Sequence, residues 1–410
     1  QQDAPALPGL PHDLAGQTKA AADSCRGGPS QGSGAEGRKP GQQLASRGGK
    51  SHGIEATRAR PAAPASSAPP PSRLPSVPEC RTWSAVHAAS PPGETIDSLG
   101  GRPTLVAIGN FDGVHLGHQS VLLDAVREAS ARNLVPVALT FDPHPTVSVG
   151  RPPPACLTRL DRKLELMRRI DPRLHTVVEH FDAAYAAQSP EQFVTRTLCA
   201  RLHAAVVRVG ENFRFGAGRV GDLPALTVLG ERLGFEARCE PLLGDDHGRY
   251  SSTRARDCIQ RGELDGARGV LGRPHCLTGV VVEGQRLARS LGFPTANLAW
   301  VVEALPPHGA YAVAVDCLDS DTPTRLGIGV ANIGIRPTVD AGFSVEAHLF
   351  DFDGDLYGRQ LRVHLLAWLR PERRFEGLDT LRAQIARDAL DARLRLHQLA
   401  GDPSASPAWY

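Results

Sequence analysis

Short apolar runs alternate with amphipathic stretches between residues 100 and 242, and no other feature constrains the fold of this chain as strongly. The runs have the length of buried strands, and the stretches between them have helical periodicity. Strands that alternate with helices pair in parallel, because each helix carries the chain back across the sheet. We therefore predict an α/β domain with a parallel sheet, whose strands lie near 105–109, 135–141, 175–180, 204–209 and 235–241.

The pattern changes after about residue 274, where strand-like runs follow one another without long helices. A series of short strands joined by turns is typical of an antiparallel barrel or sandwich. A closing helix is predicted over 378–396, with apolar residues near helical spacing at Leu378, Leu381, Ile385 and Leu390. The predicted strands of this second domain lie at 277–282, 311–315, 327–331, 344–350 and 360–366.

Residues 1–85 have a different composition, rich in Gly, Ala, Ser, Pro and Gln. Such a segment cannot bury enough apolar surface to offset the entropy that it would lose on ordering. We therefore predict a disordered low-complexity tail over 1–85, the α/β domain over 86–273 and the β domain over 274–400.

Charge and cysteine content limit the class of protein. The formal net charge of +2 at pH 7 gives no reason to expect nucleic acid or an anionic membrane as a partner. The eight cysteines form no C-x-x-C pair, which indicates reduced thiols rather than a disulfide framework or a zinc site. No apolar run approaches the length of a membrane span. Together these features predict a cytoplasmic protein.

A glycine-containing turn, GNFDGVHLGH, connects the strand near 105–109 to a helix that begins at about residue 117. The N-terminus of a helix offers free backbone N–H groups and a positive dipole end, both of which suit phosphate. His115 and His118 add hydrogen-bond donors beside them. The next strand ends on Asp142-Pro-His144, at the edge where open α/β sheets bind ligands. The buried face of the helix is predicted to consist of Leu122, Ala125, Val126 and Ala129.

Other motifs of the first domain allow both a functional and a structural interpretation. The sequence Gly216–Gly221 matches a dinucleotide-binding pattern, but 211–215 separate it from its strand, whereas the binding turn should follow its strand directly. This loop suits either nucleotide recognition or a structural turn. Ser251–Arg256 suits either a second phosphate site or a helix cap with a solvated basic face. Ser189–Gln192 has the pattern of a helix start with a capping box.

The second domain has two candidate positions. The segment LGFPTAN at 291–297 places a hydroxyl and an amide after a rigid turn, which suits Mg²⁺ or phosphate and equally suits a plain loop. Glu346 lies on a predicted strand among apolar neighbours, where a carboxylate is costly unless it is paired, exposed or functional. Strand alternation alone favours an exposed Glu346.

Seven segments in order, GNFDGVHLGH, TFDPHP, VGENFRFG, SSTRAR, LGFPTANL, ANIGIRPT and VEAHLFDFDGDLYG, resemble the bacterial bifunctional riboflavin kinase/FMN adenylyltransferases. The resemblance covers about residues 100 to 396. It implies an α/β nucleotidylyltransferase domain with a Rossmann-like parallel sheet, followed by an all-β antiparallel barrel kinase domain with a C-terminal helix. It also implies riboflavin, FMN and ATP as partners, Mg²⁺ as the metal that accompanies ATP, and no particular oligomeric state.

The resemblance assigns roles in the adenylyltransferase domain residue by residue. His115 and His118 match the residues that bind the ATP phosphates and stabilise charge in the transition state. The positions that match ATP or flavin contacts are Gly109, Phe111, Asp112, Gly113, Gly117, Asp142, His144, Asn212, Arg214, Ser251, Ser252, Thr253 and Arg256.

In the kinase domain, the resemblance makes Glu346 the general base and Thr295 the metal-binding residue, with Gly292, Pro294 and Asn297 at the nucleotide. A protein that mainly positions phosphoryl groups and neutralises charge needs only one carboxylate and a metal ion. The sequence departs from the family pattern at Ala288, where a glycine is usual, and a Cβ there costs roughly 1 kcal/mol if the backbone has positive φ.

Two other classes of function compete with this interpretation. A dinucleotide-dependent oxidoreductase would use Gly216–Gly221 together with Glu236 or Glu240 as the ribose-binding acid. A flavin-binding regulatory protein would have the same fold with inactive sites, but the matched histidines, Thr295, Asn297 and Glu346 are all present.

Overall fold

The computed structural model describes residues 100–148, 150, 152–284, 292–320, 322–335 and 343–399. The predicted tail over 1–85 and the kinase-loop residue Ala288 lie outside this part of the chain. The described sheet and barrel belong to one compact unit. No described helix is both long and apolar enough to cross a membrane. The six cysteines in the described residues are free thiols.

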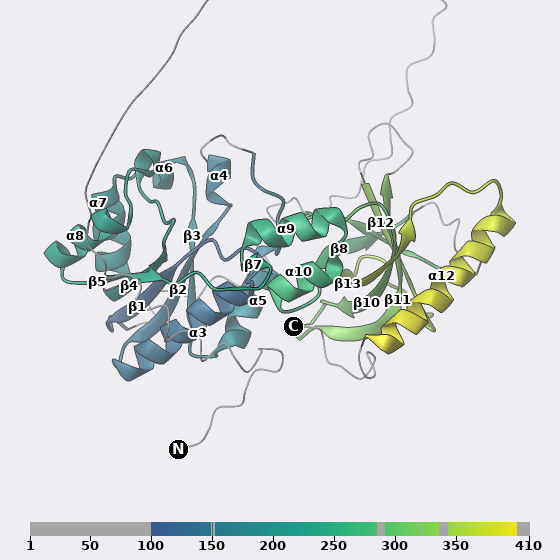
Figure 1. The fold of residues 1–410 in the computed structure, drawn as a ribbon, viewed down its shortest axis with the longest axis horizontal. Helices are drawn as coiled ribbons and strands as arrows, with labels where there is room; N and C mark the ends of the chain where they lie inside the picture. Colours follow the sequence, from purple (N-terminus) through teal and green to yellow (C-terminus); the bar gives the residue numbers. More distant parts are fainter. Residues whose placement is uncertain are drawn as a thin grey trace, which may run out of the picture. The chain divides into compact units, whose positions relative to one another are not determined.

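The first domain is built on a five-stranded parallel sheet with the strand order β3-β2-β1-β4-β5 (Figure 1). All five predicted strands are present within about two residues of their predicted ends. Strands β1, β2 and β4 are short apolar runs, whereas the edge strand β5 is polar and mostly exposed. The strands are β1 (Thr104–Ile108), β2 (Val135–Asp142), β3 (His175–His180), β4 (Ala204–Gly210) and β5 (Glu236–Glu240).

Helices cover both faces of this sheet, and each face has its own apolar core. Helix α3 buries the four predicted residues, Leu122, Ala125, Val126 and Ala129, against one face. The opposite core includes Val194 and Leu198. The predicted capping box at Ser189 is present, and its hydroxyl accepts the N–H of Gln192. The helical segments of this domain are α3 (Leu116–Ala131), α4 (Pro145–Ser148), α5 (Leu160–Ile170), α6 (Ala183–Ala186), α7 (Pro190–Phe193), the π-helix η2 (Val194–Arg201), the 3₁₀ turn η3 (Ala217–Arg219) and α8 (Leu223–Leu233).

A small hairpin, β6 (Gly244–Asp245) and β7 (Gly248–Arg249), and two short helices follow the sheet. Helices α9 (Ser252–Arg261) and α10 (Leu264–Leu271) pack on each other around Ile259 and Val270. Each helix ends on a glycine with positive φ, Gly262 or Gly272, which is the usual helix C-terminal signal.

The second domain is a closed six-stranded barrel with the order β10-β11-β12-β9-β8-β13. Its strand β9 (Ala296–Ala299) was not predicted, because the LGFPTAN segment reads as a turn and its strand is only four residues long. The other strands extend the predicted runs. They are β8 (Cys276–Val282), β10 (Gly309–Cys317), β11 (Thr324–Ile335), β12 (Phe343–Leu349) and β13 (Gln360–Pro371).

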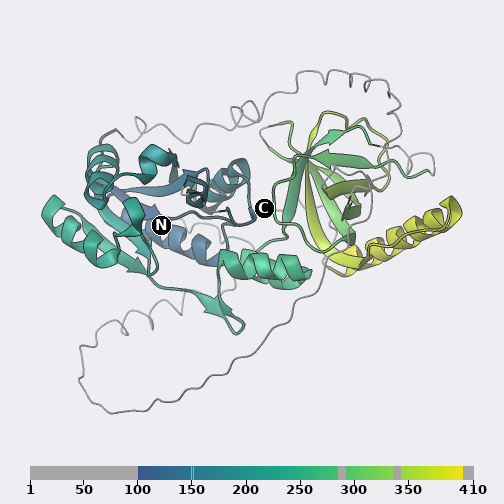
Figure 2. The ribbon, with the colours of Figure 1, turned by 90° about the horizontal axis from the view of Figure 1, so that it is seen from above.

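The closing helix α12 (Leu378–Gln398) forms where predicted and lies beside the barrel (Figure 2), but the residues that it buries differ from those expected. Leu378 and Leu390 are 52% and 64% exposed, so the predicted apolar face is wrong at these positions. The buried residues are instead Gln384, Asp388, Ala392 and Leu396. The reason lies in the barrel wall, which presents the small side chains Ala312 and Ala314 and the guanidinium of Arg370 to this helix.

Candidate active sites

The turn after β1 brings His115 and His118 together at the start of α3. His115 is the N-cap of the helix, and its Nδ1 accepts the backbone N–H of His118 at 3.3 Å. The two imidazole rings stack with their centroids 3.5 Å apart. A Cβ on Gly117 would lie 3.2 Å from the His115 ring, so the glycine leaves room for this arrangement.

Both imidazoles are neutral near pH 7. Burial, together with the positive charge of Arg273, lowers the pKa of His115 to about 4, although Asp112 partly opposes this. Burial and the neighbouring His115 hold the pKa of His118 well below its usual range. The pair therefore offers N–H donors to a ligand rather than two fixed positive charges.

Asp112 joins three segments of the chain beside this pair. Its carboxylate accepts the backbone N–H groups of Leu157 and Thr158, both at 3.1 Å, and pairs with the Arg256 guanidinium at 2.5 Å. Its carbonyl accepts the hydroxyl of Ser252 at 2.8 Å. The sequence resemblance placed Asp112 among the ligand contacts, whereas here its carboxylate is occupied by protein donors.

Gly113 belongs to the same junction. Its N–H donates to the hydroxyl of Thr158 at 3.0 Å. It has a φ of +84°, and a Cβ would come within 2.9 Å of Leu157. A side chain at Gly113 would therefore disturb both the backbone and the packing of this turn.

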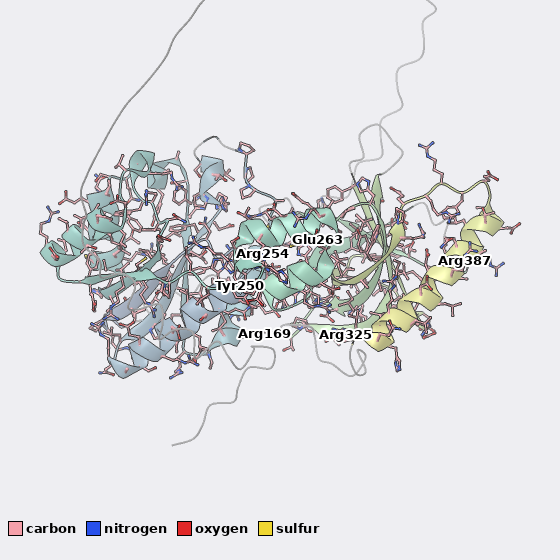
Figure 3. The ribbon with its side chains drawn as sticks, in the orientation of Figure 1. Arg169, Tyr250, Arg254, Glu263, Arg325 and Arg387 are labelled. Carbon is pink, nitrogen blue, oxygen red and sulfur yellow. The ribbon has the colours of Figure 1, made fainter. Side chains whose placement is uncertain are left out.

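The SSTRAR segment forms the first turn of α9. Ser251 is the N-cap and accepts the N–H of Arg254 at 3.1 Å, which confirms the capping interpretation. Thr253 is exposed, and Arg256 also donates from Nε to the carbonyl of Ala155 at 2.6 Å. Arg254 pairs instead with Asp245 at 2.8 Å, and its guanidinium lies 5.9 Å from the ring centroid of Tyr250, which Figure 3 labels beside it.

A cavity of about 430 Å³, which we call the sheet pocket, opens near the carboxyl ends of β1 and β2. Four predicted ligand contacts line it: Gly109, His144, Asn212 and Arg214. The His144 ring lies 3.3 Å from the amide nitrogen of Asn110, between Nε2 and Nδ2. Much of the remaining wall is aromatic, a surface suited to a planar ring system, and consists of Phe141, Phe181, Tyr185, Phe193, Phe213 and Phe215.

The other nine predicted ligand contacts of this domain, Phe111 and Asp142 among them, are not in the wall of this pocket. Phe111 is 3% exposed and belongs to the apolar core, with its ring at 5.2 Å from that of His118. Asp142 ends β2, and its carbonyl accepts the N–H of Phe181 at 3.0 Å.

The Gly216–Gly221 loop does not have the geometry of a dinucleotide-binding turn. Phe215 and Gly221 pair across the loop, so the glycines form a closed turn rather than a link from β4 directly into a helix. Helix α8 begins only after the cap Asp222. Gly216 and Gly218 line the sheet pocket instead.

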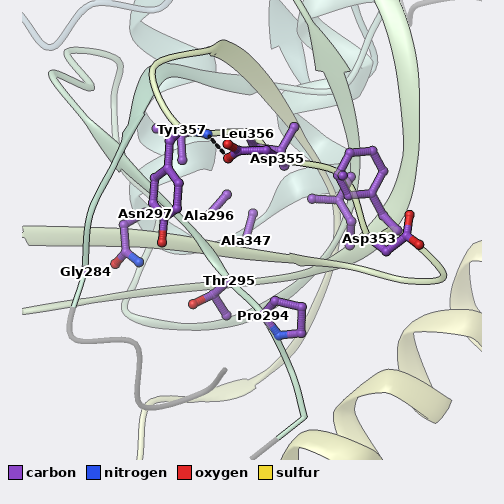
Figure 4. A pocket seen from close by; sticks show the side chains of 14 residues that line it. Gly284, Pro294, Thr295, Ala296, Asn297, Ala347, Asp353, Asp355, Leu356 and Tyr357 are labelled. Carbon is purple, nitrogen blue, oxygen red and sulfur yellow. Dashed lines mark hydrogen bonds between the residues drawn. The ribbon is translucent and has the colours of Figure 1, made fainter. Parts of the chain in front are cut away.

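The barrel has two neighbouring cavities. The acidic barrel pocket, about 520 Å³, is lined by Pro294, Asp353, Asp355 and Tyr357 among others (Figure 4). The helix-side barrel pocket, about 280 Å³, is lined by Glu346 and by residues of α12. Thr295 and Asn297 line both cavities.

Glu346 faces the helix-side pocket from β12 and is half-buried. It pairs in register with Asn297 on β9 and with Asn332 on β11. Strand alternation correctly places the Glu346 side chain outside the barrel core, but there the side chain lies in the wall of a cavity and is only partly exposed. Gly292 lies in neither pocket and is exposed, with a φ of +88°.

The oxygen donors at the wall of the helix-side pocket fit a hard divalent cation. They are the Thr295 hydroxyl, the Asn297 amide and the Glu346 carboxylate. Among the described residues no group of three His, Cys, Asp or Glu side chains forms a metal cage. Such a cage is not required, because Mg²⁺ keeps several waters and is commonly bound by one or two protein groups together with substrate phosphates.

Sequence reasoning missed several residues of these sites. Arg273 is buried and donates to the carbonyls of Gly113 and Val114 behind the histidine turn, a contact between residues far apart in sequence. Asp353 and Asp355 belong to the VEAHLFDFDGDLYG segment. Its cluster of acidic residues was the sequence feature that could have indicated a site there. Lys163 is also buried in this domain. The sequence could have drawn attention to it, because it is the only lysine after residue 50.

Comparisons with known proteins agree with this division into two sites. The chain matches the family model described as FAD synthetase over residues 100–254 and the one described as riboflavin kinase over residues 271–396. The bifunctional riboflavin kinase/FMN adenylyltransferase of Escherichia coli K12 is 40% identical over 294 residues, which are 70% of this chain and 91% of that protein. The Haemophilus influenzae protein of the same description is 35% identical over 290 residues, 70% of this chain and 92% of that protein.

A solved structure described as a macrolide-efflux protein from Streptococcus pneumoniae has the same fold. It matches with a TM-score of 0.63 and 26% sequence identity, over 74% of this chain and 98% of that chain. The agreement in structure therefore extends across both the sheet and the barrel.

Proposed function

This chain belongs to the family of bacterial bifunctional riboflavin kinase/FMN adenylyltransferases, and we propose that its two domains make FMN and FAD in succession at two separate sites. The barrel phosphorylates riboflavin, and the sheet domain transfers AMP from ATP to the FMN formed. The observation that carries this proposal is the meeting of Thr295, Asn297 and Glu346 at one barrel pocket, while His115 and His118 lie together in the other domain.

In the kinase step, Glu346 accepts the proton of the terminal ribityl hydroxyl as that oxygen attacks the γ-phosphorus of ATP, and ADP leaves. Its place at the helix-side pocket supports this role, since a general base must reach the attacking group. Thr295 and Asn297 sit at the wall shared with the acidic pocket and orient the phosphates. Positioning and charge neutralisation account for most of the catalysis in phosphoryl transfer.

In the adenylyl step, an oxygen of the FMN phosphate attacks the α-phosphorus of ATP, and the bond to pyrophosphate breaks. The neutral His115 and His118 donate hydrogen bonds to the phosphate oxygens. The aromatic wall of the sheet pocket supports binding of the flavin ring, with Asn212 and Arg214 at its edge. No covalent enzyme intermediate is needed.

Enzymes that use ATP for these transfers generally need a divalent metal ion, and we propose Mg²⁺ in both steps. Thr295, Asn297 and Glu346 are the groups that would hold it in the barrel, together with the phosphates of ATP. When bound, the ion neutralises phosphate charge. A cytoplasmic location remains a prediction from the sequence.

One incubation tests the proposal. The full chain is mixed with riboflavin, ATP and Mg²⁺, and the products are separated by chromatography. We expect FMN and ADP to form before FAD and pyrophosphate, and we expect FMN supplied with ATP to give FAD and pyrophosphate without ADP. Chelation of the divalent ion should stop both reactions. Failure to form FMN from riboflavin, or FAD from FMN, would remove the corresponding activity from this proposal.

A further inference from the structure

Lys163 is a buried cation in the first domain. It lies on α5 and is 8% exposed. Among the residues that the structure describes, none forms an ion pair or a hydrogen bond with its ammonium group. A lysine that is largely buried without such a partner is costly to keep charged, so its position calls for a compensating anion.

The acidic neighbours of Lys163, Asp112 and Asp142, belong to motifs of the adenylyltransferase site. Burial lowers the pKa of Lys163, and Asp112, Cys156 and Asp142 act in the opposite direction. In turn, the charge of Lys163 contributes to the lowered pKa of His118. Its charge also acts on His144. Lys163 therefore lies within electrostatic reach of both the GNFDGVHLGH turn and the TFDPHP segment.

The position of Lys163 is fixed by the junction at Asp112. The carboxylate of Asp112 holds the N–H groups of Leu157 and Thr158, and α5 begins two residues later, at Leu160. Lys163 thus follows, within one helical turn, a segment that is hydrogen-bonded to the histidine turn. This connection ties the start of α5 to the turn that carries His115 and His118.

The other cations around the histidines are already engaged. Arg256 pairs with Asp112 and with the carbonyl of Ala155, and Arg273 donates to backbone carbonyls of the histidine turn. Since His115 and His118 are neutral, these groups leave a site for a highly charged triphosphate short of positive charge. Lysine also differs from arginine here, because a compact ammonium acts as a point charge in a narrow site. Only four of the 46 basic residues are lysines, and the other three lie at 19, 39 and 50.

We propose that the Lys163 ammonium binds a phosphate group of ATP in the adenylyltransferase site and neutralises the charge that moves onto pyrophosphate. In this step the FMN phosphate oxygen forms its bond to the α-phosphorus, and the electron pair of the broken phosphoanhydride bond leaves with pyrophosphate. Lys163 keeps its proton throughout. This inference rests on the proposed adenylyl transfer and adds a catalytic residue to it.

The test replaces Lys163 in the full chain. Lys163→Met removes the charge and keeps the length of the side chain, and Lys163→Arg keeps the charge in a different shape. We expect Lys163→Met to lower kcat/KM for ATP in FAD synthesis by about 10²–10³-fold, as loss of one charge-stabilising donor does in other enzymes. Arg168→Met is the matched control, because Arg168 lies on the same helix and is exposed. Riboflavin phosphorylation is measured for each variant as well, and an unchanged rate shows that the barrel is intact.

Binding measurements separate the two phosphate sources. Calorimetry with pyrophosphate and with FMN should show weaker pyrophosphate binding by Lys163→Met and unchanged FMN binding. The reverse result would move Lys163 to the FMN phosphate and overturn the assignment to ATP. FAD synthesis by Lys163→Met within threefold of wild type would overturn the proposal as a whole. Failure of the wild-type chain to make FAD would count against the proposed function, while pyrophosphate binding would still test Lys163.

Stability distinguishes binding from a structural role. Removal of an unpaired buried charge should leave the melting temperature of Lys163→Met equal to or above that of wild type, because stabilising changes at functional sites commonly cost activity. A marked fall in melting temperature, together with equal loss of both activities, would show that Lys163 supports the fold instead.

Discussion

His115 caps the helix that carries His118, so the same side chain stabilises the fold and, in the proposed adenylyl step, binds phosphate. Its Nδ1 is occupied by the N–H of His118, which leaves Nε2 to carry a hydrogen toward a ligand. The Nδ1 of His118 is buried without a hydrogen-bond partner among the described residues. His118 is therefore the member of the pair whose removal should affect ligand interactions more than helix capping.

Replacement of His118 by Ala should abolish most FAD synthesis and leave riboflavin phosphorylation near normal. Loss of a charge-stabilising donor costs about 2.7–4 kcal/mol in transition-state free energy, or 10²–10³-fold in rate. FAD formation from FMN and FMN formation from riboflavin are measured on the same preparation. His247→Ala serves as the control, because His247 is exposed. An equal fall in both activities would contradict the two-site arrangement.

Glu346→Gln tests the base of the kinase step, since the amide keeps the size of the side chain and removes the basic carboxylate. We expect riboflavin phosphorylation to fall by roughly 10²–10⁴-fold. FAD synthesis from supplied FMN should persist, because its groups lie in the other domain. The exposed Glu376→Gln is the matched control. Near-normal FMN production by a well-folded Glu346→Gln protein would leave positioning and the metal as the agents of catalysis.

The sequence predicted those site residues that belong to contiguous motifs, and it missed those that reach the site from elsewhere. His115 and His118 stand in one turn, and Glu346 stands in a strand next to an acid-rich segment. Arg273 approaches the histidine turn across more than 150 residues of sequence, and only the fold brings them together. Asp112 was recognised as part of a motif, but its hydrogen bonds to Leu157 and Thr158 depend on tertiary packing.

At the scale of elements, periodicity predicted the sheet well and α12 only in part. Parallel strands buried on both sides are continuous apolar runs, which are visible in the sequence. Helix α12 instead packs on the barrel mainly through small and polar residues. Two of its apolar residues, Leu381 and Ile385, line the helix-side pocket. The short strand β9 was missed because its pairing with β8 and β12 comes from the barrel rather than from local preference.

Asp388→Ala should destabilise the barrel, because it leaves the Arg370 guanidinium without its carboxylate. The two side chains are joined at 2.7 Å, and Gln384 donates to the same carboxylate. We expect the free energy of unfolding to fall by about 2–4 kcal/mol, somewhat less than for a fully buried pair, since Arg370 is partly exposed. Urea denaturation measures this fall. Asp391→Ala, at an exposed position of the same helix, should change stability little.

At the scale of the whole molecule, an ion pair connects the sheet domain and the barrel. Arg362 on β13 pairs with Glu165 on α5 at 2.7 Å. Arg162 and Arg362 keep the pKa of Glu165 down at about 2, against the effect of burial.

His275, just before β8, is buried, and its Nε2 lies 2.7 Å from the carbonyl of Ala304.

Acid should weaken the folded chain through His275. Burial lowers the pKa of His275 from 6.5 to about 4. Between these values the unfolded chain binds a proton that the folded chain does not, so stability falls as pH decreases through this window. At about pH 5 this single group should cost about 2 kcal/mol relative to neutral pH. His275→Gln keeps a hydrogen-bond donor. Between neutral pH and about pH 5, its free energy of unfolding, measured by urea denaturation, should fall by about 2 kcal/mol less than that of the wild type. Identical pH dependence of the two proteins would contradict this prediction.

Residues 1–85 should be dispensable for both reactions, as their composition suggests. A truncated chain that begins near Thr82 should remain soluble and make FMN and FAD at the rates of the full chain. The comparison needs equal molar amounts of both proteins in the same coupled assay. Loss of soluble protein, or of either activity, would show that this segment supports the folded domains.

Thr295 and Asn297 belong to the walls of both barrel pockets, and this has a thermodynamic consequence. Two ligands that fill adjoining cavities with common walls cannot bind independently if each one orders the same side chains. Any factor by which the first ligand changes the affinity of the second must equal the factor by which the second changes the affinity of the first. If the phosphate donor and acceptor of the proposed kinase step occupy these two pockets, any coupling between them through Thr295 and Asn297 must therefore be reciprocal.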